Sequence, residues 1–326
     1  MTDERVVLVL TEQFDPTTDR VVEKLNSRRV PVFRCDSADF PQQLTMTATA
    51  DHGRWTGSLR AEHRDVHLED IRSVYYRRPG AFVFRDDMPS VARRFAEAEA
   101  RYGFGGVLAG LDCFWLNHPA KIADAEYKPF LLQIASHCGL RVPRSRITND
   151  PASARAFVDS VNGRAIYKPL SGTGFAKGDA AAALFTSPVA CEDADDPRIA
   201  LTAHLFQEWV PKRHEVRLTA VGDDLFAVVI DVQGSEAATI DWRADYGSHR
   251  YMPTETPKDV RGGVHDLLAR MGLAFGAFDF VVTPEGEWVF LEINPNGQWG
   301  WIEASTDLPI SSAIADALER GYVCGY

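Results

Sequence analysis

Residues 278–303 read FDFVVTPEGEWVFLEINPNGQWGWIE, and this stretch predicts a β-hairpin. Two apolar runs, FDFVV and WVFLEI, flank the turn-forming sequence PEGE at residues 284–287. If Thr283 faces Trp288 across the turn, the register of the whole strand pair is set. Because strand side chains alternate between two faces, this register also decides which residues of the two strands meet.

The predicted register brings acidic side chains together. Asp279 faces Glu292, and Asn294 lies on the same face as Glu292, two residues further along. Directly opposed like charges destabilise a strand pair, so these carboxylates need a proton or a cation between them. Oxygen ligands without a nearby Cys or His favour Mg²⁺ or Mn²⁺ over zinc. The alternative is a solvated hairpin edge whose acidic residues are incidental.

The overall composition is that of an ordinary globular chain. Its 326 residues are 45% apolar, which is enough for two or three packed units. The net charge of -11 and the isoelectric point near 5.3 argue against a nucleic-acid partner bound through a broad basic surface. The same acidity suits either a basic partner peptide or an acidic enzyme.

No apolar run has the length of a membrane span, and the first residues, MTDERVVLVLTEQF, contain acids and no cleavable apolar core. We therefore expect no membrane partner and a cytoplasmic protein. The cysteines are odd in number and lack metal-site spacing, so we interpret them as reduced packing residues. They are Cys35, Cys113, Cys138, Cys191 and Cys324.

The first part of the chain, residues 1–118, predicts an α/β domain with a parallel sheet. An apolar β-branched run is followed by Asp15-Pro16, a helix cap with proline at the first helical position, and then by a second strand. The expected elements are strands at 6–11, 30–35 and 73–77, helices at 16–28 and 90–111, and a hairpin around 51–53.

The remainder predicts two further units, at residues 119–203 and 204–326. In the first, a helix over 124–138 and a second over 151–161 precede a strand at 165–169, a glycine-rich loop and a strand at 181–185. The acidic, turn-rich residues 187–198 predict a mobile surface loop. Strands are expected in the last unit at 204–210, 215–221 and 225–232, before the hairpin.

Lys168 lies on a strand directly before the loop SGTGFAKG, which contains Gly172, Gly174 and Gly178. Glycines allow backbone N–H groups to surround a phosphate, and the lysine adds a positive charge. The spacing matches neither the Rossmann fingerprint nor the P-loop. A glycine-rich loop alone is weak evidence, so the order of the features around it decides the interpretation.

That order resembles the ATP-grasp superfamily over about residues 119–326. In that family two lysines hold the ATP phosphates, a short strand pairs its backbone with adenine, and an acid binds the ribose. The matching short strand here is QEWV at 207–210. The implied residues are Lys128 and Lys168 for the phosphates, Gly172 and Gly174 in the loop, Glu208, Trp209 and Val210 in the hinge, with the backbone of Trp209 and Val210 on the base, and Glu215 for the ribose.

The family's metal ligands fall at Asp279, Glu292 and Asn294, the residues that the hairpin register already brings together. The resemblance implies ATP as cofactor with two Mg²⁺ ions, and Mn²⁺ as the alternative metal. It also implies an α/β (α+β) class with an ATP-grasp fold behind an N-terminal pre-ATP-grasp domain. Taken singly, each of these residues could instead have no binding role, for example as a solvated lysine or a surface acid.

Three motifs narrow the resemblance: YYRRP at 75–79, DWR at 241–243 and LEINPNGQWGWIE at 291–303. They are similar to those of the graspetide synthetases, ATP-grasp ribosomal peptide maturases of the microviridin-ligase type. The opening VLTEQFDPTTDRVVEKL is also similar, so the resemblance spans nearly the whole chain.

This resemblance implies an enzyme that phosphorylates Asp or Glu side chains of a ribosomal precursor peptide, a leader followed by an acidic core. A Ser or Thr hydroxyl or a Lys amine then displaces the phosphate to close an ester or amide ring. The sequence is compatible with a homodimer as well as with a monomer.

We assign Arg217 and Arg243 to the reacting carboxyl and γ-phosphate oxygens, because a guanidinium matches that geometry with two hydrogen bonds. Surface and structural roles are the alternatives for both. His214 is a possible base for the hydroxyl nucleophile or a plain surface residue. Of Arg77 and Arg78, strand alternation allows only one to face the cleft, where it would meet substrate.

Two other functions share these nucleotide residues. One is a small-molecule or protein-tail carboxylate-amine ligase of the glutathione-synthetase or glutamate-adding type, which differs only in its substrate. The other is a nucleotide-binding regulator without chemistry. A complete metal triad and two arginines argue against the regulator, which has no need for the full set.

Overall fold

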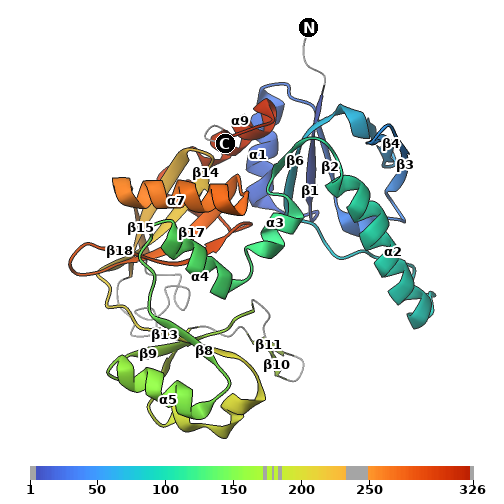
Figure 1. Ribbon diagram of the computed structural model, residues 1–326. Helices are drawn as coiled ribbons and strands as arrows, with labels where there is room; N and C mark the ends of the chain where they lie inside the picture. The colour runs from blue at the N-terminus through green and yellow to red at the C-terminus, as the bar shows by residue number, and fades with distance from the viewer. Residues whose placement is uncertain (1–4, 172–174, 178–179, 183–185, 233–248, 324–326) are drawn as a thin grey trace.

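The computed structural model describes residues 5–171, 175–177, 180–182, 186–232 and 249–323. Three main sheets organise the described chain (Figure 1). The middle sheet lies below the C-terminal sheet, and the N-terminal domain lies beside them (Figure 1). Gly172, Gly174, Gly178 and Arg243 lie outside the described residues.

The N-terminal sheet is parallel, as the sequence predicts, with strand order β2-β1-β6-β7. Val7 and Val9 of β1 face helix α1, whereas Leu8 and Leu10 face helix α2, so both faces are covered. This explains the unbroken apolar run of β1. The elements are β1 (Val6–Thr11), α1 (Pro16–Ser27), β2 (Val32–Cys35), β6 (Ile71–Arg78), α2 (Ser90–Ala109), β7 (Phe114–Leu116) and α3 (Pro119–Asp124), with a smaller sheet of β3 (Thr45–Asp51), β4 (Arg54–Arg60) and β5 (Asp65–His67).

The middle sheet is antiparallel, in the order β12-β9-β13-β8, and helix α5 covers one face. Residues 187–198 are not the surface loop predicted from their acidity, because residues 187–189 form strand β12, which pairs with β9. The acids are used locally, since Asp195 pairs with Arg155 at 2.6 Å and Asp193 accepts the Ala190 N–H at 3.0 Å. The elements are β8 (Ser145–Thr148), α5 (Pro151–Ser160), β9 (Ala165–Lys168), β10 (Phe175–Lys177), β11 (Ala180–Ala182), β12 (Ser187–Val189) and β13 (His204–Glu208).

The C-terminal sheet is also antiparallel, in the order β16-β15-β14-β17-β18. Helices α7 and α4 pack on one face, where Leu131, Val264 and Leu267 join Leu218 and Phe278 in a core. The elements are α4 (Lys128–His137), β14 (His214–Val221), β15 (Asp224–Val232), β16 (His249–Thr254), α7 (Lys258–Met271), β17 (Phe275–Val282), β18 (Trp288–Asn294), α8 (Gly300–Thr306) and α9 (Ile310–Arg320).

The helix predicted over 124–138 forms as α4, but it begins four residues later than expected. Helix α3 ends at Asp124, and α4 begins at Lys128 with Pro129 in its first turn. Proline lacks the N–H that a continuous helix would need there and fits at a helix start, so the chain breaks between the two helices. The break places Lys128 at the N-terminus of α4.

The predicted hairpin forms, but its turn is one residue tighter than expected. The Thr283 N–H bonds to the Glu287 carbonyl at 2.9 Å, and Val282, not Thr283, faces Trp288. A register shift beside Asp279 leaves Leu291 without a partner in the ladder. This extra residue restores the predicted register, so Asp279 does face Glu292.

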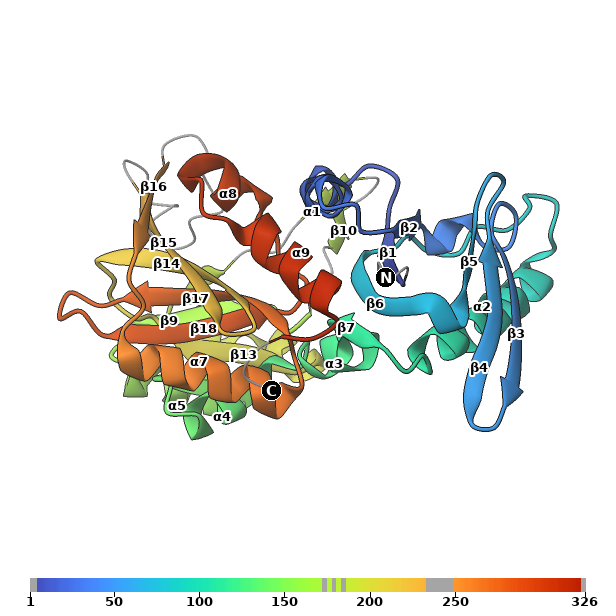
Figure 2. The ribbon, with the colours of Figure 1, turned by 90° about the horizontal axis from the view of Figure 1, so that it is seen from above.

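Helix α9 joins the N-terminal and C-terminal parts. Ile310 and Ile314 share one core with Val7 and Val21 of the first domain and with Phe275 of β17. Figure 2 shows α9 between the two regions, beside α1. Among the described residues, no helix combines the length and the apolar character that crossing a membrane requires.

Two adjacent glycines of α7 test how tightly the C-terminal core is packed. A methyl group on Gly263 would lie 2.5 Å from Leu140 Cδ2 and 2.9 Å from the Cys138 carbonyl oxygen, whereas one on Gly262 meets nothing within 4 Å. We expect Gly263→Ala to destabilise the protein by about 1–3 kcal/mol and Gly262→Ala to stabilise it by about 0.5–1 kcal/mol. Urea unfolding midpoints measure both changes, and shifts in the same direction would contradict this packing.

Candidate active site

A cleft lies where the middle sheet meets the C-terminal sheet. Many of the residues predicted from the sequence line it, although they come from separate strands and loops. They are Lys168, Glu208, Trp209, Val210, Glu215, Asp279 and Glu292.

Strand alternation explains how these residues reach one cleft. In β9, Ile166 and Lys168 line the cleft, whereas Ala165 and Tyr167 pack toward α5. In the C-terminal sheet the core beneath α7 takes the residues of the opposite parity, such as Phe280. Each sheet therefore buries one face under helices and leaves polar side chains on the other.

The two predicted phosphate lysines are close to the same segment. Lys168 is buried, with 6% of its surface exposed, and lines the cleft. The Lys128 ammonium donates to the Pro169 carbonyl at 2.7 Å, directly after Lys168 in the chain, and lies 3.8 Å from Glu292 Oε2. Lys128 thus connects the segment that leads into the glycine-rich loop with the acidic hairpin.

In the predicted hinge, backbone groups are partly used by the protein itself. The Trp209 N–H donates to the Arg164 carbonyl at 2.9 Å, and the Glu208 N–H donates to the Arg144 carbonyl at 2.8 Å. The Trp209 backbone can therefore bind the adenine base only through its carbonyl group. Glu215, predicted to bind the ribose, is buried and forms an ion pair with Lys212.

Gln207, the first residue of QEWV, holds an unpaired acceptor. Its amide nitrogen donates to Ser145 Oγ at 3.0 Å, and the Ser145 hydroxyl donates to the Pro143 carbonyl at 3.0 Å. The serine's own proton is thereby used, so the glutamine amide is oriented with its nitrogen toward Ser145. The Gln207 side chain is buried and its Oε1 has no hydrogen-bond partner.

Arg217 bonds to one of the two opposed acids. Its Nη1 donates to Asp279 Oδ1 at 2.7 Å, across the β14–β17 pair that places the two residues opposite each other. Both side chains are buried. Arg217 and Lys128 therefore already provide part of the positive charge that the sequence predicts beside these opposed acids. Removing one partner of such a buried pair costs about 3–5 kcal/mol.

The acidic pair nevertheless fits a magnesium ion held together with a nucleotide. Asp279 and Glu292 supply oxygen donors in the cleft, and Asn294 is exposed at the end of β18. Within the described part of the chain, no three His, Cys, Asp or Glu side chains form a self-sufficient metal site. Mg²⁺ is characteristically bound through one or two carboxylates with phosphates and water completing its shell.

His214 lies at the start of β14, and the residues that line the cleft include its neighbours Lys212 and Glu215 but not His214 itself. Burial and the nearby Arg213 lower its pKa, while Asp231 acts in the opposite direction. Its imidazole is therefore more easily kept neutral than an exposed one. The structure does not bring this predicted base to the cleft.

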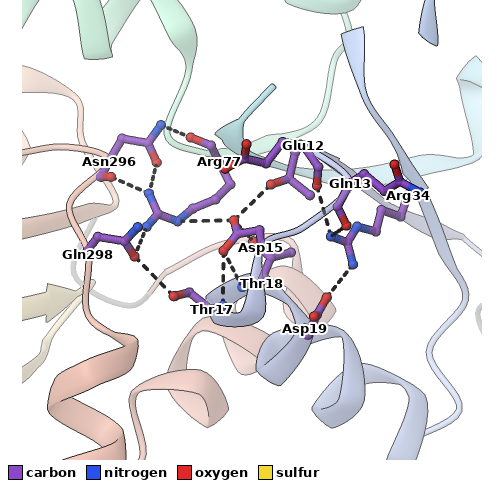
Figure 3. Close-up of polar contacts among 11 residues, drawn as sticks. Glu12, Gln13, Asp15, Thr17, Thr18, Asp19, Arg34, Arg77, Asn296 and Gln298 are labelled. Carbon is purple, nitrogen blue, oxygen red and sulfur yellow. Dashed lines mark hydrogen bonds and ion pairs between the residues drawn. The ribbon is translucent and has the colours of Figure 1, made fainter. Parts of the chain in front are cut away.

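Arg77 is the inward-facing member of the Arg77-Arg78 pair, but it does not meet the cleft. It is 1% exposed, and its guanidinium donates to Asn296 Oδ1 at 2.9 Å and to Gln298 Oε1 at 2.8 Å (Figure 3). Asp15 lies beside it, with Oδ2 4.0 Å from Arg77 Nε. The sequence indicates Asp15 only as a helix cap, and Asn296 and Gln298 only as members of the motif NPNGQW.

The chain is similar to known ATP-grasp enzymes. A family model described as the MvdD pre-ATP grasp domain matches residues 6–123. The RiPP-associated ATP-grasp ligase of Chryseobacterium gregarium, solved in complex with ADP and a leader and core peptide, is 30% identical over 96% of each chain, with a TM-score of 0.89. RiPPs are ribosomally synthesised and post-translationally modified peptides. A comparison with curated proteins gives no match.

Two macrocyclases of Microcystis aeruginosa MRC are also similar. MdnB is 32% identical, with 96% of this chain and 99% of that chain covered and a TM-score of 0.79. MdnC, solved with the precursor peptide MdnA, is 28% identical, with coverage of 97% and 99% and a TM-score of 0.85.

The fold and the site define an ATP-grasp ligase with an N-terminal pre-ATP-grasp domain. The chain belongs to the RiPP-associated ATP-grasp ligases, the graspetide synthetases, which confirms the resemblance seen in its motifs.

The acidic hairpin generates a prediction about metal use. Glu292→Gln keeps the shape of the side chain but removes one charged oxygen ligand, so we expect ATP turnover to fall at least about tenfold and to need more Mg²⁺. The exposed Glu285 on the same hairpin provides the control Glu285→Gln. ADP formation measured across a Mg²⁺ titration tests this. Equal Mg²⁺ curves for the Glu292 variant and the wild type would contradict the assignment.

Proposed function

We propose that the protein macrocyclises a ribosomal precursor peptide at the expense of ATP. In the proposed reaction, an Asp or Glu side chain of the peptide attacks the γ-phosphate and releases ADP. A Ser or Thr hydroxyl or a Lys amine of the same peptide then displaces phosphate and forms an ester or an amide. The precursor consists of a leader and an acidic core, and the reaction takes place in the cytoplasm.

The observation that carries this proposal is the similarity over almost the entire length to peptide-modifying ligases. The Chryseobacterium ligase is described with ADP, a leader and a core peptide, and MdnB is described as a macrocyclase. Both are at least 30% identical to this chain. MdnC, described with its precursor peptide, is similar over the same extent.

The cleft residues suit this chemistry. We propose that Lys128 and Lys168 hold the ATP phosphates, with Gly172 and Gly174 of the loop around them, because lysine ammonium groups are suited to phosphate oxygens. Glu208, Trp209 and Val210 then face the adenine, and Glu215 faces the ribose.

The remaining residues act on the reacting end of the nucleotide. Asp279, Glu292 and Asn294 would hold two Mg²⁺ ions, with Mn²⁺ as an alternative, and the metal would neutralise phosphate charge. Arg217 and Arg243 orient the carboxyl group and the transferred phosphoryl group, because a guanidinium binds two oxygens at once. This role is supported by the bond of 2.7 Å between Arg217 and Asp279, which lines the cleft.

A small-molecule carboxylate-amine ligase would use the same nucleotide residues. The fold extends to such enzymes, since D-cycloserine synthetase DcsG matches with a TM-score of 0.57, but the sequence identity is only 16%. The Chryseobacterium ligase and MdnB have both a higher sequence identity and a higher TM-score to this chain. This difference favours the peptide substrate.

The central prediction separates ATP binding from the reaction on the peptide. Wild-type protein incubated with ATP, Mg²⁺ and an acidic-core precursor should remove one water and form one ADP for each ring. Arg243→Ala should bind ATP normally but produce no dehydrated peptide, because it loses a contact made mainly in the transition state. Mass spectrometry and calorimetry measure the two effects. Ligation of free amino acids to a small carboxylate, with every precursor left unmodified, would establish the alternative ligase.

Gln207 provides a test of the base site. Its unpaired carbonyl oxygen would accept a hydrogen bond from the exocyclic amine of adenine, and an unsatisfied buried acceptor costs about 1–3 kcal/mol. We expect ATP to bind about tenfold more tightly than purine riboside triphosphate, which lacks the amine. Gln207→Met, which has a similar volume, should remove this difference. Calorimetry with both nucleotides gives the ratio; equal affinities in the wild type would place adenine elsewhere.

A further inference from the structure

Arg77 forms hydrogen bonds to residues 296–298, the segment that follows the acidic hairpin. Besides its bonds to the side chains of Asn296 and Gln298, it donates to the Asn296 carbonyl, and Asn296 Nδ2 donates back to the Arg77 carbonyl. The segment is thus held by both the side chain and the backbone of β6 (Figure 3). Arg77 and Asn296 are 219 positions apart in the chain, so this contact joins the two ends of the protein.

The same segment holds Arg217 from its other side. Arg217 Nη2 donates to the Gln298 backbone carbonyl at 3.2 Å, while Nη1 binds Asp279. Gln298 therefore accepts a hydrogen bond from Arg77 on its side chain and one from Arg217 on its backbone carbonyl. A continuous series of contacts leads from Arg77 through Gln298 and Arg217 to Asp279, which faces Glu292.

There is little room for this segment to move independently of Arg217. A methyl group on Gly297 would lie 2.9 Å from Arg217 Nη2, 2.5 Å from Ala277 Cβ and 2.9 Å from Asn294 Cβ. These distances are shorter than ordinary van der Waals contact, so the backbone of Gly297 packs directly on the guanidinium. A displacement of residues 296–298 would therefore displace Arg217.

The other end of the series is fixed in the first domain. Asp15 caps helix α1 through the N–H groups of Thr17 and Thr18, at 3.1 and 3.2 Å, and accepts the Thr18 hydroxyl at 2.6 Å. Burial opposes ionisation of Asp15, but the hydrogen bonds from Thr18 and Thr11 and the charge of Arg77 outweigh it and lower its pKa. A carboxylate fixed in this way provides a rigid charged anchor for Arg77.

The loop that carries Asp15 is braced as well. Arg34 of β2 donates to the carbonyls of Glu12 and Gln13, both at 3.1 Å, and its Nη1 binds Asp19 at 2.5 Å (Figure 3). Thr17 adds a direct bond to Gln298 Oε1 at 3.2 Å. The first domain thus presents an ordered surface on which residues 296–298 rest.

We infer that Arg77 is a positioning residue for the reaction: through Gln298 it sets the direction of the Arg217 guanidinium beside Asp279, which lines the cleft. The first domain then contributes to catalysis without touching the nucleotide. This inference rests on the proposed role of Arg217. It goes beyond that role because it makes a residue of the N-terminal domain, outside the cleft, control the reaction rate.

Arg77→Lys tests the inference, because lysine keeps the charge but cannot bind Asn296 and Gln298 together. We expect kcat to fall about tenfold to a hundredfold, the loss typical of a misplaced catalytic group, with KM for ATP changed less than about twofold. Gln298→Ala keeps the backbone carbonyl but removes the contact with Arg77, so it should cause a similar loss. The double variant should be no slower than the slower single variant, because both changes break one series of contacts.

Ser73→Ala is the matched control for stability. Ser73 lies on the same strand as Arg77, is fully buried and donates to the Leu318 carbonyl of α9 at 2.8 Å. It stabilises the same junction between the first and last parts of the chain without contacting residues 296–298. We expect the thermal unfolding midpoint of Ser73→Ala to fall while its kcat stays at the wild-type value.

The outcomes separate the possibilities. A normal kcat in Arg77→Lys or in Gln298→Ala overturns the inference, as does an equal kcat loss in Ser73→Ala; if Arg77→Lys does not fold, Gln298→Ala gives the answer. If the wild type modifies a small carboxylate and no peptide, the proposed substrate fails, and the same comparison is made with that carboxylate. If the wild type forms no ADP with any carboxylate, the proposed function and the inference fail together.

Discussion

The bond between Arg217 and Asp279 is the interaction around which the cleft is organised. Two carboxylates face each other on neighbouring strands, and such a pair is tolerated only where positive charge is close. Arg217 comes from the strand paired on the other side of Asp279, so three adjacent strands place their charges in one row. The guanidinium is almost completely buried, and the carbonyl of Gln298 accepts a hydrogen bond from its second terminal nitrogen.

The contact between Arg217 and the Gln298 carbonyl also constrains the path of residues 294–300. Residues 294–300 must leave β18, pass against Arg217 and enter α8, and glycine occupies the positions where a side chain would collide. A methyl group on Gly300 would lie 2.7 Å from Thr17 Oγ1, so the chain is also close to α1. The apolar core shared by α1, α9 and β17 then holds this contact in place. The N-terminal domain therefore packs against the same segment that contacts Arg217.

Local patterns in the sequence were sufficient for much of this architecture. Alternation in FDFVV and WVFLEI gave the Asp279–Glu292 pairing, and Asp15-Pro16 gave the start of α1. The pairing was right although the turn was wrong by one residue, because the extra residue Leu291 compensates, and no local signal marks that bulge. The partners of Arg77 were not predictable, since strand alternation shows that one arginine points inward but not which distant loop it meets.

The charges around the acidic pair also bear on how a metal ion enters the site. Arg217 lies 2.7 Å from Asp279, and Lys128 lies 3.8 Å from Glu292, so each carboxylate already has a cationic neighbour. A divalent ion approaching this arrangement alone meets little uncompensated negative charge. Nucleotide phosphates would change the balance, because they bring negative charge of their own and would attract Lys128 away from Glu292. The arrangement therefore favours the joint arrival of Mg²⁺ and ATP over a metal site formed in advance.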